Sequence, residues 1–128
     1  MSTPIAFKSL LEFDGVIGAV RWRESVAGKG AIAPPFMVEH IGDISIERAK
    51  RLMTHSEALS LSIHGISQIG HEAATKDPTI VYPVDAFAAH GMRTSIISTI
   101  NRVTVLYDNN MKLDIQALTE KMNLVDNS

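Results

Sequence analysis

The stretch Leu10-Leu11-Glu12-Phe13-Asp14-Gly15-Val16-Ile17-Gly18-Ala19-Val20 places a helical pattern directly before a strand pattern. Phe7, Leu10 and Leu11 recur at helical spacing, and Asp14-Gly15 ends that helix. Beyond Gly15 both alternating sets of positions are apolar or small. Because successive side chains of a strand point to opposite faces, we expect the first half of this strand to be buried on both faces.

A short strand and a long helix are expected next. Pro34-Pro35 removes two donors in succession, so the regular part of the second strand should cover residues 36–40, as an edge strand or after an irregular start. Gly42-Asp43-Ile44-Ser45 then supplies helix-entry chemistry, with Asp43 or Ser45 as the N-cap. We expect a helix from there to about Glu72.

Two stripes run along this expected helix. The bulky one carries Leu52, Leu59, Ile66 and Ile69, and we assign it to the sheet. The other consists mainly of small residues, and we assign it to a second copy of the helix. It predicts a homodimer whose helical interface contains Ala49, Met53, Ser56, Ser60, Ile63 and Ser67.

Three consecutive strands and a last helix complete the pattern. The strands are expected over residues 84–89, 92–100 and 102–108, joined by tight hairpins in which Gly91 and Asn101 tolerate positive φ. Asp114 is the expected N-cap of the last helix. The buried stripe of that helix is predicted to be Ile115, Leu118 and Met122, and the tail from Asp126 is predicted to fray.

The order helix, two strands, long helix, three strands, helix resembles the roadblock/dynein light chain superfamily. Residues 10–16, Val38-Glu39-His40-Ile41-Gly42-Asp43-Ile44-Ser45 and residues 103–109 are similar to a small bacterial branch of unknown function. The resemblance implies one α+β domain over residues 1–128, an α/β/α sandwich. In it, a five-stranded antiparallel sheet carries the long helix on one face and the two terminal helices on the other.

The resemblance also implies an assembly. Members form homodimers in which the long helices pack together and one edge strand pairs with its copy, which here would involve Val84, Ala86 and Ala88. Members often bind small Ras-like GTPases or act as assembly platforms. The family pattern contains no catalytic residue.

The composition limits the classes of partner that we expect the protein to bind. Twelve basic and fourteen acidic residues give a net charge of −2 at pH 7, without a long basic tract, so neither nucleic acid nor an anionic membrane is an expected partner. No apolar run is long enough to cross a bilayer, no signal peptide is evident and cysteine is absent. We therefore expect a cytoplasmic protein without membrane insertion.

No catalytic, metal or cofactor site is predicted. His64 and His71 lie seven residues apart, whereas helical ligands of one ion normally lie three or four apart. The serines lack a nucleophile-elbow pattern, and no glycine-rich segment has phosphate-loop spacing. Arg21-Trp22-Arg23 could stack a nucleotide base, although such a tryptophan more often fills the rim of a core.

Two main hypotheses for the function remain, with an enzyme as a third. The first is a non-enzymatic homodimeric interaction or scaffold module that serves another protein, for example a Ras-like GTPase. The second is a small-ligand sensor with a cavity between the sheet and residues Val26–Pro35. For the first hypothesis, the expected partner-binding residues are Ile32, Pro34, Pro35 and Phe36, unless Ile32 and Phe36 fold back over the core.

We predict that the purified protein retains no stoichiometric zinc or copper after dialysis against a chelator, because its histidines do not have the spacing of a shared site. Elemental analysis of the dialysed protein measures this. One equivalent of either metal would show that the histidines form a site.

Overall fold

The computed structural model describes residues 4–23, 35–59 and 86–127. The helix that begins at residue 46 is described to residue 59, so its expected extension to Glu72 lies outside the described residues. The named elements follow in chain order: the 3-10 helix η1 (Phe7–Glu12), β1 (Val16–Arg23), β2 (Phe36–Gly42), β3 (Ala86–His90), β4 (Thr94–Thr99), β5 (Val103–Asp108) and the α-helix α2 (Ile115–Asn123).

The five strands form one antiparallel sheet in the order β2-β1-β5-β4-β3. The central strand β5 is buried along nearly its whole length, as its sequence Val-Thr-Val-Leu-Tyr suggests. β2 and β3 form the two edges. The expected α+β class and the five-stranded antiparallel sheet are therefore confirmed.

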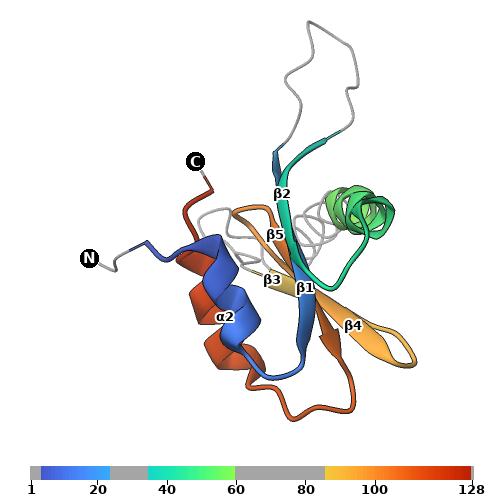
Figure 1. The fold of residues 1–128 in the computed structure, drawn as a ribbon, viewed down its shortest axis with the longest axis vertical. Helices are drawn as coiled ribbons and strands as arrows, with labels where there is room; N and C mark the ends of the chain where they lie inside the picture. Colours follow the sequence, from blue (N-terminus) through green and yellow to red (C-terminus); the bar gives the residue numbers. More distant parts are fainter. Residues whose placement is uncertain (1–3, 24–34, 60–85, 128) are drawn as a thin grey trace, which may run out of the picture.

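Helices cover both faces of this sheet (Figure 1). Ala19 and Val20 are neighbours on β1 and are both fully buried, yet they belong to different cores. Ala19 packs with residues of η1, β5 and α2, on what we call the terminal-helix face. Val20 packs with Trp22, Ala49 and Met53 under the 46–59 helix, on the long-helix face.

Two bulges set which side chains reach each face. In the pairing of β1 with β5, Val16 lies opposite Tyr107 and Gly18 opposite Leu106, so Ile17 is an extra residue. As a result Val16 packs on the terminal-helix face, whereas uninterrupted alternation would place it on the same face as Val20. A second bulge at Val38 places Met37 opposite Trp22. Neither bulge was predicted from the apolar alternation.

The 46–59 helix buries the stripe that we had assigned to a second copy. Ser45 caps it, because the Arg48 amide donates to Ser45 Oγ over 3.2 Å. On this helix Ala49, Met53 and Ser56 are buried, whereas Leu59 is exposed and Leu52 is only half-buried. The packing assignment of the two stripes is therefore wrong for this part of the helix. Small residues let the helix approach its own sheet closely.

The terminal elements differ from expectation in three details. The N-terminal helix is a six-residue 3-10 helix, and Ile5 before it forms a parallel bridge with Val125. Ile115 is 44% exposed, so the buried stripe of α2 consists of Leu118 and Met122. Asn127 is held rather than frayed, because its side-chain amide nitrogen lies 2.6 Å from the carbonyl oxygen of Asn101.

Both expected β-hairpins, β3–β4 and β4–β5, are present, but the residues of their turns differ from the expectation. β4 begins at Thr94, so Met92 belongs to the hairpin bend and is fully exposed. In the β4–β5 turn the left-handed residue is Arg102, with φ of 62°, rather than Asn101. Asn101 instead donates from its side chain to the carbonyl oxygens of Met122 and Val125, which ties the turn to α2.

We predict that Gly42→Ala lowers the free energy of unfolding by more than about 2 kcal/mol. Gly42 has φ of +85°, and a Cβ atom there would lie 2.4 Å from the Ile17 carbonyl oxygen. Urea denaturation measures the loss. Lys50→Ala, at an exposed position of the 46–59 helix, is the control and should change stability by less than about 0.5 kcal/mol. A mild Gly42→Ala variant would mean that the backbone there can relax.

Candidate functional site

The β3 edge is the surface that the expected homodimer would use. Among the described residues β3 pairs with β4 alone, so the other side of its backbone has no strand beside it. Ala88 is exposed and Ala86 is half-buried, whereas Val84 lies outside the described residues. Small side chains along an open edge leave the backbone accessible to another strand.

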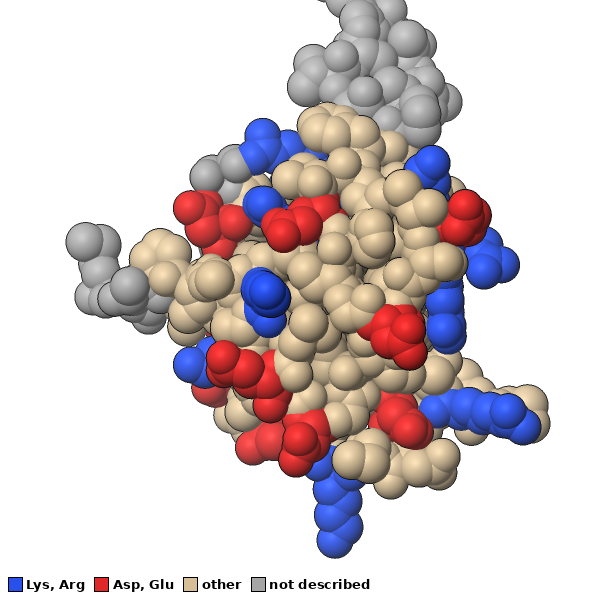
Figure 2. All heavy atoms as spheres, viewed as in Figure 1, with Lys and Arg blue, Asp and Glu red and all other residues tan. Residues whose placement is uncertain are grey.

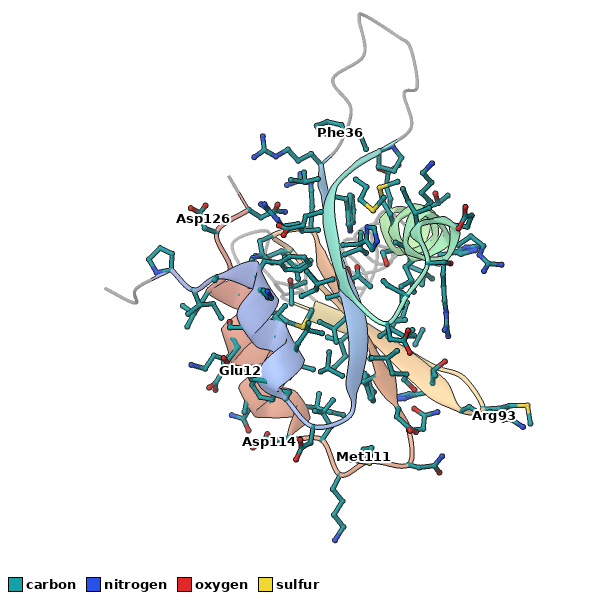
Figure 3. The ribbon with its side chains drawn as sticks, viewed as in Figure 1. Glu12, Phe36, Arg93, Met111, Asp114 and Asp126 are labelled. Atoms are coloured by element: carbon teal, nitrogen blue, oxygen red, sulfur yellow. The ribbon has the colours of Figure 1, made fainter. Side chains whose placement is uncertain are left out.

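Asn109 ties the β3–β4 hairpin to the end of β5. Its backbone amide donates to the carbonyl oxygen of Arg93 over 2.9 Å, and its side-chain amide donates to that of Gly91 over 2.6 Å. The Gly91 amide closes the turn onto Thr94 over 2.9 Å. Figure 3 shows Arg93 projecting from the tip of this hairpin. The tip is thus fixed from inside while Met92 and Arg93 remain exposed.

Side-chain hydrogen bonds also connect Asn109 to β4 and, through β4, to β3. The Oδ1 atom of Asn109 accepts a hydrogen bond from the hydroxyl of Ser95. The same hydroxyl oxygen lies 3.1 Å from Nδ1 of His90, which is directly opposite Ser95 in the β3–β4 register. Ser95 is buried, so a substrate cannot reach it as a nucleophile.

Three buried hydroxyl groups join the 46–59 helix to the sheet. Thr104 Oγ1 of β5 lies 3.0 Å from Ser56 Oγ on the helix and 2.9 Å from Ser98 Oγ on β4. All three residues are almost completely buried. The cluster satisfies polar groups that would otherwise be buried without partners, and it therefore favours one position of the helix on the sheet.

The structure bears on the predicted dimer-interface residues only in part. Ala49, Met53 and Ser56 are buried against the sheet of their own chain, so a second copy could not contact them in this arrangement. Ser60, Ile63 and Ser67 lie outside the described residues. The homodimer itself stays a prediction, and the β3 edge is the described part of it that remains accessible.

The predicted partner-binding segment is also described only in part. Phe36 is 50% exposed and lies at the start of β2 (Figure 3), while Pro35 is half-buried. Phe36 therefore does not fold back into the core. Ile32 and Pro34, and with them most of the Val26–Pro35 segment of the ligand-sensor hypothesis, lie outside the described residues.

The base-stacking interpretation of Arg21-Trp22-Arg23 is wrong. Trp22 is only 2% exposed and packs with Val20, Ala49 and Met53, so its ring faces are not available to a ligand. Arg21 forms an ion pair with Glu39, with 3.0 Å between Nη2 and Oε2, and its guanidinium lies 5.7 Å from the Phe7 ring centroid. The ion pair holds β2 on β1 and the Phe7 contact holds η1 on β1, so these contacts do not form a nucleotide site.

The rest of the described surface shows few features of a binding or catalytic site. Figure 2 shows acidic and basic side chains interspersed over one face of the molecule, without a patch of one sign. An open hollow of about 450 Å³ lies along η1, beside Ala6, Lys8, Ser9, Leu11 and Glu12. In the described ranges, no three metal-ligating side chains gather and no helix is long and apolar enough to span a membrane.

Comparison with known proteins found no matching family model, no matching curated protein and no matching solved structure.

The sequence reading missed the residues that build these networks. Asn109 entered the sequence analysis only as the last residue of the 103–109 segment that carries the resemblance, and Ser95 and Thr104 only as residues of expected strands. Asn109 lies 18 residues from Gly91 and Thr104 lies 48 residues from Ser56, whereas His90 and Ser95 are only five residues apart and meet across the β3–β4 hairpin. A usable signal was the presence of the hydroxyl residues Ser95, Ser98 and Thr104 within strands expected to be buried, since buried hydroxyls need partners.

We predict that Thr104→Val lowers the free energy of unfolding by about 1–3 kcal/mol, because it leaves the Ser56 and Ser98 hydroxyls buried without their shared partner. Thermal or urea denaturation measures the change. The triple variant Ser56→Ala, Ser98→Ala, Thr104→Val should be more stable than the sum of the single losses predicts, since it removes every orphaned group. Strictly additive losses would argue against a connected cluster.

Proposed function

We propose that the chain is a non-enzymatic homodimeric interaction or scaffold module of the roadblock/dynein light chain kind. The observation that carries the proposal is the β3 edge, which has no neighbouring strand among the described residues. A strand from a second copy would extend the sheet there through backbone hydrogen bonds, and the small side chains of Ala86 and Ala88 would not obstruct it.

The braced hairpin supports this assignment. Asn109 holds the turn that follows β3 at two carbonyl groups. An edge strand that is ordered before association loses less conformational entropy when it pairs, so more of the interaction energy appears as affinity. The proposed partner of the dimer is another protein, such as a small Ras-like GTPase or a complex under assembly. That partner class rests on the resemblance of the sequence.

We predict that Ala88→Lys converts the homodimer to a monomer without unfolding it. Ala88 is exposed, so a lysine is tolerated in the single chain, whereas two lysines facing each other across a shared edge repel and resist desolvation. Sedimentation at micromolar concentration measures the oligomeric state, and circular dichroism confirms the fold.

The matched control is Val38→Lys on the opposite edge strand β2, where the native side chain is also exposed. This variant should remain a dimer. A monomeric wild-type chain would contradict the proposed homodimer. A dimer lost with Val38→Lys but kept with Ala88→Lys would move the interface to β2.

A further inference from the structure

The hydrogen bonds around Asn109 determine which way its side-chain amide points. Its nitrogen lies 2.6 Å from the Gly91 carbonyl oxygen, which can only accept. The other amide atom, facing Ser95, is therefore the oxygen, and it too can only accept. A flipped amide would set two oxygens against each other at Gly91.

The hydrogen bonds of the Ser95 hydroxyl then determine which ring nitrogen of His90 carries a proton. The Ser95 hydroxyl has one proton, which it donates in the hydrogen bond to Asn109 Oδ1. The hydroxyl oxygen can only accept from the His90 Nδ1 atom, 3.1 Å away. Nδ1 therefore carries a proton, and in the neutral ring Nε2 carries a lone pair.

The Nε2 atom of His90 has no partner within the part of the chain that the structure describes. His90 is exposed, and among the described residues no hydrogen bond or ion pair engages this atom. His90 is the last residue of β3, so a strand that pairs with the β3 edge would run beside it. An outward acceptor at this position can select a donor group on that strand.

We propose that Ser95 and Asn109 lock His90 in the Nδ1–H tautomer, and that its Nε2 atom is a hydrogen-bond acceptor site for an N–H or O–H donor of the second copy docked on the β3 edge. The second half of this inference rests on the proposed homodimer. Ser95 and Asn109 are positioning residues, and His90 makes the contact.

The tautomer is tested directly by long-range nitrogen–proton correlation spectra of the histidine rings in alkaline buffer, where histidine is neutral. His90 is assigned by its disappearance in the His90→Asn variant. We expect its unprotonated nitrogen to be Nε2, and we expect the preference to be lost in Asn109→Ala. An Nε2–H tautomer in the wild-type protein would overturn the lock.

Two replacements separate the lock from the contact. Asparagine places an amide nitrogen near the position of Nδ1 and has no atom at the position of Nε2, whereas glutamine can place its amide oxygen near the position of Nε2. His90→Asn should leave hydrogen-exchange protection of the β3–β4 hairpin unchanged and weaken dimerisation. The expected loss is about fivefold per hydrogen bond, counted twice in a symmetric dimer. His90→Gln should restore much of the affinity.

The outcomes distinguish the acceptor role of His90 from the proposed homodimer. If the wild-type chain dimerises and His90→Asn dimerises equally well, the acceptor role is wrong while the proposed function stands. If the wild-type chain is a monomer, the homodimer and the docking contact both fail. The spectra then decide the tautomer lock by themselves.

Discussion

Gly18 of β1 and Gly42 of β2 lie opposite each other, and their missing side chains allow the layered arrangement. A Cβ atom on Gly42 would lie 2.6 Å from the Gly18 Cα atom, and one on Gly18 would lie 2.9 Å from the Ile44 side chain. Ile44 can therefore pack over β1 as the chain leaves the sheet. This crossing sets the start of the 46–59 helix and brings Ala49 and Met53 over Val20 and Trp22.

The apolar pattern of the chain predicted where the strands lie, because a strand covered on both faces has buried residues at successive positions. The hairpins came from the same pattern together with short turns, whereas the five-stranded antiparallel sheet was implied by the family resemblance and its strand order was not predicted. The bulges at Ile17 and Val38 were not predictable in this way, since an extra residue changes which face a side chain reaches without altering composition. The helix stripes were misassigned because small residues suit a sheet and a second helix equally well.

Asparagine residues have a larger role in this chain than turn formation. Asn101 and Asn127 connect the β4–β5 turn with α2 and with the end of β1 through carbonyl groups. Asn109 performs the corresponding task at the opposite end of the sheet. Strand ends leave carbonyl groups without ladder partners, and the asparagine amides satisfy several of them. The candidate site depends on such long-range contacts, which explains why sequence reasoning located the edge strand but not its bracing residues.

The parallel bridge between Ile5 and Val125 has a mechanical consequence. The Ile5 amide donates to the Leu124 carbonyl oxygen over 2.9 Å, and the two segments run in the same direction. A pulling force that enters before Ile5 and leaves after Val125 would load this contact in shear, across its hydrogen bonds rather than along them. The contacts of the Asn127 amide with the carbonyl groups of Trp22 and Asn101 lie closer to the C-terminal point of force and would be loaded together with the bridge.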